Sequence, residues 1–154
     1  MKNVLLSMFI VFGLIACDGN KKGTFLKTVT SPYTQAQSVK KLQNVIKQKG
    51  LTLFETIDHK ANAAAVKMNL KPETVVVFGN PRMGTILMDC NPSMGLDLPL
   101  RILVNTTYEG VTSFTYTNPE YWSLKHNIKD KTCLGIINKA AIALAEIVDE
   151  ASKK

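Results

Sequence analysis

The sequence has few of the residues that build common metal centres and covalent catalytic sites. Its 154 residues include three cysteines, two histidines and one tryptophan. The cysteines lie far apart, so the paired spacings typical of zinc sites and of c-type haem attachment are absent. The glycine patterns of the P-loop and the dinucleotide-binding turn are absent too, as is the G-x-S-x-G elbow of serine hydrolases. These absences favour a non-enzymatic protein, although they leave an enzyme of another kind open.

Long apolar runs and clusters of one charge are also scarce. The run Val4–Ala16 is too short to cross a bilayer of about 30 Å as a helix, but it has the length of a signal-peptide core. The formal net charge is +7, yet the lysines are scattered and no basic cluster is interleaved with aromatic residues. The composition therefore gives no indication of a nucleic-acid partner.

The apolar run ends at Ala16-Cys17, which resembles the box that precedes the lipidated cysteine of bacterial lipoproteins. We expect residues 1–16 to be a signal peptide, Cys17 to carry acyl chains such as palmitate, and residues 17–23 to be a polar tether. The lipid would hold the protein at a bacterial cell membrane, facing the periplasm or the cell exterior. An ordinary signal peptide with an incidental cysteine and an uncleaved anchor are the alternatives.

Two cysteines remain once Cys17 is modified. Cys90 and Cys133 would then lie in a compartment that permits disulfides. The sequence leaves a bridge between them open, because it does not show whether their Cα atoms approach within about 7 Å.

The pattern of apolar residues divides residues 24–154 into the elements of one α+β domain. Thr34 and Gln37 have the spacing of a capping box, before a helix that we expect to end near Gly50. A second long helix is expected from about residue 132 to residue 151. Strands are expected at 24–30, 51–57, 74–78, 100–107 and 111–117. Together these elements predict a mainly antiparallel sheet of about four to five strands with two main helices packed on one face.

Several short strings resemble one known family. They are Ile57-Asp58-His59, Val77-Phe78-Gly79-Asn80-Pro81, Gly84-Thr85, Leu87-Met88, Pro92, Gly95–Arg101, Tyr116 and Asn118-Pro119. Together they are similar to the family called domain of unknown function 302, from about Thr28 to the C-terminus. The resemblance implies a small α+β domain with helices on one side of a sheet, and homodimers in some members. It implies no activity, and Cys90 stands where a non-thiol residue would be more usual.

The segment Gly79–Thr85 combines a strand end, a glycine-containing loop and a short helix that we expect Thr85 to cap. Such a turn can present backbone N–H groups to an anion, and Arg82 can add a charge-assisted contact. A tight turn without a ligand is the alternative.

Our leading hypothesis is a non-enzymatic binding or accessory domain with a pocket between Gly79–Thr85, Asp97–Arg101 and His59. The ligand would be a small anion, or an apolar molecule with an anionic end. The residues expected to contact it are Asn80, Arg82, Thr85, His59, Asp97 and Arg101.

Other chemistries stay open. Imidazole and thioether ligands suit Cu(I) and haem iron, so His59, Met88 and His126 form an alternative metal site. A histidine beside a carboxylate can act as a general base, which makes Asp58, His59 and Asp97 a third possibility.

The sequence identifies no cofactor, and Ser93 has no supporting context as a nucleophile. Tyr116, Tyr121 and Trp122 lie near Asn118-Pro119, where they can form either one wall of an apolar pocket or ordinary core.

Overall fold

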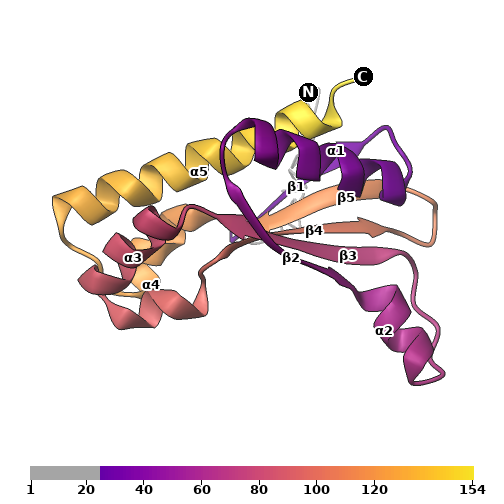
Figure 1. The fold of residues 1–154 in the computed structure, drawn as a ribbon, viewed down its shortest axis with the longest axis horizontal. Helices are drawn as coiled ribbons and strands as arrows, with labels where there is room; N and C mark the ends of the chain where they lie inside the picture. The colour runs from indigo at the N-terminus through magenta and orange to yellow at the C-terminus, as the bar shows by residue number, and fades with distance from the viewer. Residues whose placement is uncertain (1–24) are drawn as a thin grey trace, which may run out of the picture.

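The computed structural model describes residues 25–154, so the expected signal peptide, the lipidated Cys17 and the tether lie outside the described residues. Figure 1 shows a sheet with two long helices, α1 (Gln35–Gln48) and α5 (Lys131–Ser152), lying across one face. The predicted α+β class, with two main helices on one face of an antiparallel sheet, is confirmed. Within the described residues, no helix combines the length and apolarity needed to cross a membrane.

The sheet has five strands in the order β1-β5-β4-β3-β2, and every neighbouring pair is antiparallel. The strands are β1 (Leu26–Ser31), β2 (Thr52–Asp58), β3 (Glu73–Gly79), β4 (Leu100–Thr106) and β5 (Thr112–Thr117). A register shift between Leu53 and Glu55 interrupts the pairing of β2 with β3. The β4–β5 hairpin turns through Gly110, whose φ of 83° is one that glycine adopts without steric cost.

Local signals in the sequence explain where α1 begins. The Thr34 side chain accepts from the Gln37 backbone N–H, and the Gln37 side chain accepts from the Thr34 backbone N–H, so the predicted capping box is confirmed. The chain then leaves the helix through Gly50 at φ 68°. Leu42, Val45 and Ile46 form the buried stripe of this helix against the sheet.

Buried side chains form two clusters. The first fills the space between the sheet and the two long helices. Its members are Leu42, Val45, Ile46, Val76, Phe78, Ile102, Val104, Phe114, Tyr116, Leu144, Ile147, Val148 and Ala151. The second lies around the first half of α5 and contains Leu87, Met94, Trp122, Ile128, Cys133, Ile136 and Ile137. Leu100 packs against both, so it marks the boundary between them.

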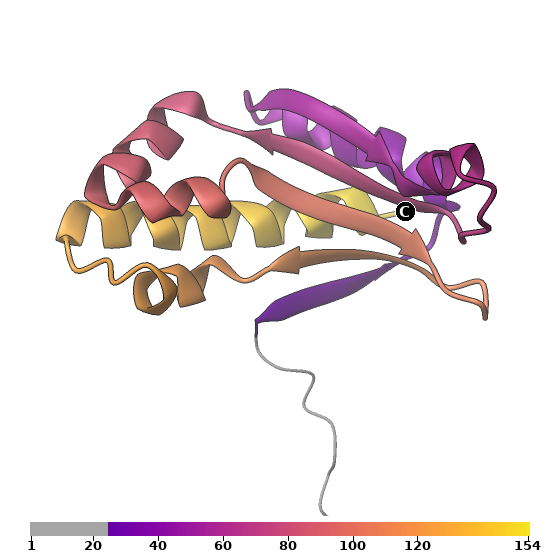
Figure 2. The same cartoon turned by 90° about the horizontal axis from the view of Figure 1, so that it is seen from below.

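Short helices build the second cluster. Figure 2 shows α3 (Pro81–Cys90) and α4 (Trp122–Lys125) beside the first half of α5, beyond the strand ends. Two 3₁₀ turns, η1 (Pro92–Leu96) and η2 (Pro119–Tyr121), lie between these helices and the strands, while α2 (His59–Ala65) follows β2.

The expected start of the helix after β3 is wrong. Asn80, rather than Thr85, is the N-cap of α3, and Pro81 follows it at the first helical position. Gly84 and Thr85 therefore lie inside a helix, and the Thr85 hydroxyl donates to the Pro81 carbonyl at 2.9 Å. The glycine-containing anion loop predicted at Gly79–Thr85 is thus replaced by a helix that begins directly after the strand.

Candidate ligand-binding site

A cleft of about 480 Å³ opens where β3 ends, between α3 and α5, and we call it the apolar cleft. Most of its lining atoms are carbon or sulfur. The lining residues are Leu51, Phe54, Gly79, Asn80, Pro81, Met83, Gly84, Thr85, Leu87, Met88, Leu98, Pro99, Leu100, Trp122, Ile136, Lys139, Ala140 and Ala143. This volume lies within the range of small-molecule pockets, about 300–1,000 Å³.

Small residues on facing elements leave this space open. Gly84 on α3 faces the pocket, where a Cβ atom would lie 3.8 Å from Leu98 Cδ1. Ala140 and Ala143 occupy lining positions of α5, where a longer side chain would extend into the cleft. The apolar cleft is therefore a result of residue size on two helices, and a single large substitution should fill part of it.

Trp122 lines the apolar cleft and carries an unused hydrogen-bond donor. Its side chain is only 3% exposed, and its indole Nε1 is a buried polar atom without a hydrogen-bond partner among the described residues. A buried donor without a partner costs about 1–3 kcal/mol, and most such atoms in folded proteins are paired. Trp122 also borders a smaller cavity of about 70 Å³.

Besides Trp122, three lining residues carry polar side chains. Asn80 Oδ1 accepts from the Met83 backbone N–H at 3.2 Å, because it caps α3. The Thr85 hydroxyl bonds within the same helix. Lys139 on α5 is exposed and brings a positive charge to the lining. The lining of the cleft is thus uncharged except at Lys139, which supplies a positive charge.

Of the predicted ligand-contact residues, Asn80 and Thr85 line the apolar cleft, whereas Arg82 is exposed on α3 and is not among its lining residues. Asp97 and Arg101 line the smaller cavity together with Trp122. The Arg101 guanidinium donates to the Leu96 carbonyl at 2.8 Å.

His59 is the clearest correction to the predicted pocket. In the antiparallel pairing of β2 with β3, Thr52 lies opposite Gly79 and Asp58 lies opposite Thr74. His59 follows Asp58, so it lies at the other end of these strands, roughly 20 Å from Gly79 for a seven-residue strand. The structure therefore brings His59 neither to the apolar cleft nor to Asp97. Asp58 is the N-cap of α2 and accepts from the Ala61 N–H at 2.9 Å.

His126 belongs to a polar network that the sequence did not suggest. Its Nδ1 lies 2.7 Å from Ser93 Oγ, and its Nε2 lies 2.5 Å from Asp97 Oδ2. A neutral imidazole that donates a hydrogen bond from Nε2–H to Asp97 can accept a hydrogen bond from the Ser93 hydroxyl at Nδ1. Lys125 Nζ lies 2.9 Å from the same carboxylate. Burial raises the pKa of Asp97, but the hydrogen bonds with Lys125 and His126 outweigh burial and lower this pKa below its usual value.

A serine, an imidazole and a carboxylate joined by hydrogen bonds in this order also form the catalytic triad of serine hydrolases. However, Ser93 and His126 do not line the apolar cleft, and the Ser93 backbone N–H is bound by Asn91 Oδ1 at 2.9 Å. The His126 backbone N–H donates to the Trp122 carbonyl at 2.8 Å. We therefore interpret the network as a tie between η1 and α4 that positions Trp122. Both ring nitrogens of His126 are engaged, so the alternative metal site with His59 and Met88 is not assembled here.

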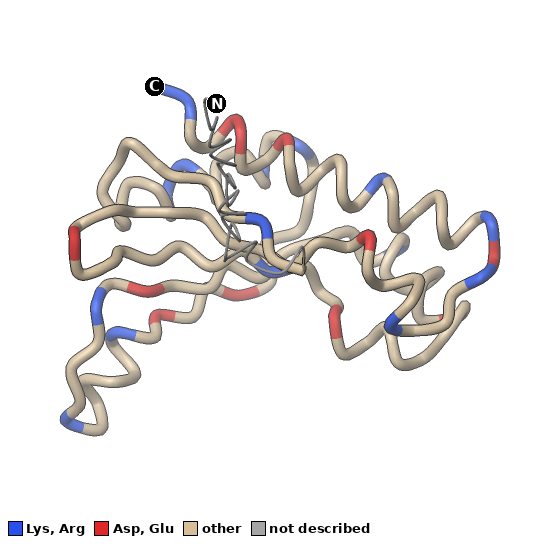
Figure 3. The backbone as a smooth tube through the Cα atoms, turned by 180° about the vertical axis from the view of Figure 1, so that it is seen from behind, with Lys and Arg blue, Asp and Glu red and all other residues tan. Residues whose placement is uncertain are grey.

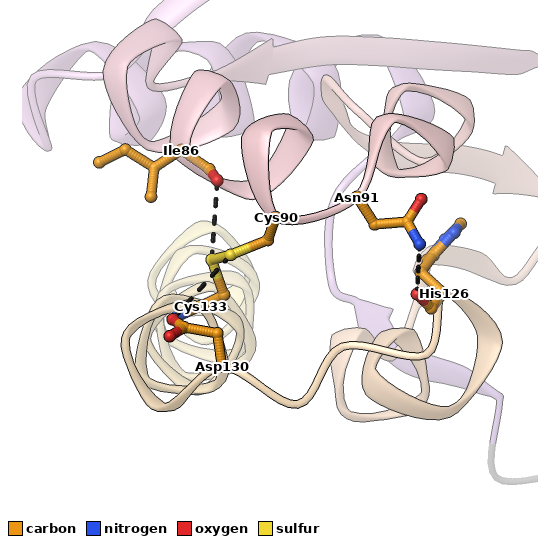
Figure 4. Close-up of a disulfide and its surroundings, with 6 residues drawn as sticks. All are labelled: Ile86, Cys90, Asn91, His126, Asp130 and Cys133. Carbon is orange, nitrogen blue, oxygen red and sulfur yellow. Dashed lines mark hydrogen bonds between the residues drawn. A yellow bond between two sulfur atoms is a disulfide. The ribbon is translucent and has the colours of Figure 1, made fainter.

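A disulfide joins α3 to α5 beside the second core cluster. The Cys90 and Cys133 sulfurs are 1.96 Å apart and the Cα atoms 6.8 Å apart. Cys90 is the last residue of α3 and Cys133 lies in the first turn of α5, as Figure 4 shows. The bridge therefore connects the two helices that form opposite walls of the apolar cleft.

Charged residues do not gather at one place. Figure 3 shows lysine and arginine positions distributed across the molecule, with acidic positions between them. Two exposed ion pairs link Lys49 to Glu146 and Glu150 at 3.4 and 2.7 Å, and such pairs contribute little to stability.

The fold and the cleft define a small α+β domain with a cavity between two helices at the end of an antiparallel sheet. Residues 27–151 match the family described as Domain of unknown function DUF302, and the chain belongs to that family. The predicted family resemblance is thus confirmed.

Curated relatives carry a more specific description. The chain is 32% identical over 103 residues to "Fluoride-specific ion channel FluC 1" of Brucella suis biovar 1 (strain 1330), a match that covers 67% of this chain and 41% of that protein. "Fluoride-specific ion channel FluC 2" of Brucella melitensis biotype 1 matches with the same identity and length, over 38% of its own chain. The chain thus spans about two fifths of the length of the curated relatives it matches.

A solved structure shares the fold. The crystal structure of an uncharacterized conserved DUF302 protein from Bacillus stearothermophilus superposes with a TM-score of 0.74 at 19% identity. The match covers 83% of this chain and 98% of the Bacillus chain. Because that chain consists almost wholly of the shared domain, we take the domain to fold on its own.

Proposed function

We propose that this protein is a non-enzymatic binding domain that holds an apolar molecule in the cleft between α3 and α5. The observation that carries the proposal is an apolar cleft of about 480 Å³ lined by Trp122, whose indole N–H is buried and has no partner among residues 25–154. An acceptor on a bound molecule would satisfy this donor. Lys139 would attract an anionic end of the same molecule to the cleft.

The indole N–H of Trp122 and the ammonium group of Lys139 favour different parts of the ligand. An isolated carboxylate beside the buried indole would lose its hydration without gaining a countercharge, which is costly. A neutral oxygen, such as a ketone, ester or hydroxyl, suits Trp122 better, and the anionic group suits exposed Lys139. The ligand class is therefore an apolar chain or ring system with an anionic end and a neutral oxygen along its body.

Burial energies set the expected affinity. About ten buried methylenes contribute about 8 kcal/mol, while association costs at least about 4 kcal/mol. The difference of about 4 kcal/mol corresponds to a dissociation constant of about 1 mM for a ten-carbon probe.

The experiment uses residues 24–154 and two probes, decanoate and an oxo-decanoate with one added ketone. Trp122 is the single tryptophan of the chain, so its fluorescence reports occupancy of the cleft directly. We expect both probes to change this fluorescence with saturation, and the ketone to bind more tightly. Calorimetry replaces fluorescence for Trp122→Phe, which keeps an aromatic ring but removes the N–H.

Matched variants separate cleft binding from adsorption to the surface. Ala140→Phe should abolish saturable binding because it fills the cleft, whereas Ala145→Phe, on the exposed side of α5, should leave binding unchanged. Lys139→Gln should weaken decanoate binding, and Trp122→Phe should remove the advantage of the ketone. Equal binding by the Ala140→Phe and Ala145→Phe proteins would show that the apolar cleft is not the site.

The place of the domain in the cell is part of the proposal. We propose that Cys17 carries the lipid anchor and that the domain faces the periplasm or the cell exterior. The match to part of proteins named as ion channels supports an accessory role beside a membrane. Fluoride conduction belongs by name to those whole proteins, and no observation on this chain carries it over. Cys17→Ala should move the protein from the membrane fraction to the soluble fraction and abolish incorporation of a palmitate analogue.

A further inference from the structure

Three potential metal ligands meet at the junction of α3 and α5. The Cys90 sulfur, the Cys133 sulfur and a carboxylate oxygen of Asp130 all lie within 4.8 Å of one another. Asp130 is the N-cap of α5, and its Oδ1 accepts from the Cys133 backbone N–H at 2.9 Å. Figure 4 shows the carboxylate beside the two sulfurs. This cluster is separate from the apolar cleft, because none of its members lines that cleft.

We propose that reduction of the Cys90–Cys133 disulfide creates a cation site in which two thiolates and the Asp130 carboxylate bind Zn²⁺ or a similar thiophilic cation. In the oxidised protein the sulfurs are bonded to each other and the site is closed. The proposal is independent of the ligand that the apolar cleft binds.

The reductant is a dithiol. One of its thiolates attacks the sulfur of Cys90, because Cys90 is an exposed residue whereas Cys133 is only 1% exposed. The disulfide bond breaks, a mixed disulfide forms at Cys90, and Cys133 leaves as a thiolate. The second thiolate of the reductant then attacks the mixed disulfide, releases the Cys90 thiolate and closes the reductant's own disulfide. Binding of the cation displaces whatever protons the two thiolates have taken up.

The reduced cluster favours a cation for electrostatic reasons. Two thiolates and one carboxylate within a few ångströms repel one another, and a divalent cation between them turns this repulsion into attraction. We therefore expect the reduced cluster to bind a cation and the disulfide-bonded cluster to bind none.

The backbone already has the required spacing. Tetrahedral Zn²⁺ with Zn–S bonds of about 2.3 Å places two thiolates roughly 3.7 Å apart. The Cα separation of 6.8 Å between Cys90 and Cys133 gives the side chains room to reach this spacing by rotation. Asp130 supplies the third ligand, and the fourth position remains for water, as in three-ligand zinc sites. Thiolates exclude Mg²⁺ and Ca²⁺ as the preferred ions.

The test uses residues 24–154, in which Cys90 and Cys133 are the only cysteines. The protein is reduced with a dithiol, freed of reductant without oxygen, and titrated with Co²⁺ as a spectroscopic substitute for Zn²⁺. We expect one Co²⁺ per chain, a thiolate-to-cobalt charge-transfer band, and displacement by Zn²⁺. The oxidised protein should give no such band, and the reduced protein without a band would overturn the proposal.

Two aspartates provide a matched pair of variants. Asp130→Asn removes the anionic ligand but keeps a good N-cap, so α5 should remain folded. It should weaken Zn²⁺ binding by about tenfold or more, whereas Asp58→Asn, the same change at the N-cap of α2, should leave it unchanged. Cys133→Ser should abolish the charge-transfer band, with circular dichroism as the check of folding. Equal Zn²⁺ affinity of the two asparagine variants would refute the role of Asp130.

Discussion

Reduction of the Cys90–Cys133 disulfide should weaken the domain by several kcal/mol without unfolding it. The bridge closes a chain segment with a sequence separation of 43. In the chain-entropy description, a loop of this length restricts the unfolded chain enough to contribute about 4 kcal/mol. A domain of this size has a free energy of unfolding of about 5–15 kcal/mol, so the reduced form should stay folded but become less stable.

Urea denaturation of residues 24–154, followed by circular dichroism, measures this loss. With a urea m value of about 2 kcal/mol/M, the midpoint should fall by roughly 2 M on reduction. A metal chelator must be present in both samples, because a cation bound to the reduced cluster would restore part of the stability. Thiol titration of the unfolded protein should find no free thiol before reduction and two per chain afterwards.

The reasoning would be refuted by a midpoint shift below about 0.5 M in a protein whose thiol count changes from none to two. Such a result would mean that the segment between the two cysteines is equally restricted without the bridge. The double variant Cys90→Ser/Cys133→Ser is the control, since its midpoint should not respond to the reductant.

Substitutions at three further residues test the core packing, a helix cap and the ionisation of Asp97. Met94→Ala should lower the free energy of unfolding by about 2–5 kcal/mol, measured by urea denaturation, because Met94 is 0% exposed in the second core cluster. Asn80→Ala should cost about 1 kcal/mol and Asn80→Asp close to nothing, because either asparagine or aspartate can cap α3. The lowered pKa of Asp97 means that its ionised form stabilises the fold above the ordinary carboxyl pKa near 3.8, and that this contribution is lost as the pH falls through the lower pKa of the folded state. Stability measured against pH should therefore fall less steeply below pH 4 for Asp97→Asn than for the unchanged protein.

The fold was largely predictable because its signals are local. The capping residues of α1 lie three positions apart, and the strands alternate or run apolar over a few residues. The start of α3 was missed although its signal was present. Asn-Pro begins a helical element at Asn80, Asn91 and Asn118, but the glycines near Asn80 suggested a loop there.

The candidate site was less predictable because it depends on contacts between distant segments. His59 was placed with Gly79 because the sequence does not state how β2 pairs with β3, and antiparallel pairing separates them. Ser93 and His126 meet across 33 residues, and no spacing rule links them. Trp122 was recognised as a possible pocket wall, but the small size of Ala140 has a meaning only once α3 is known to face α5.

The most direct test of ligand binding in the apolar cleft is the nitrogen-15 NMR signal of the Trp122 indole N–H, which is the single indole signal of the chain. Residues 24–154 should be titrated with the oxo-decanoate probe and, in parallel, with decanoate. We predict a saturable downfield shift of this signal with the ketone and a smaller shift with decanoate, because only the ketone supplies a neutral acceptor to the buried donor. An indole signal that stays unchanged at probe concentrations that shift backbone signals elsewhere would contradict the account.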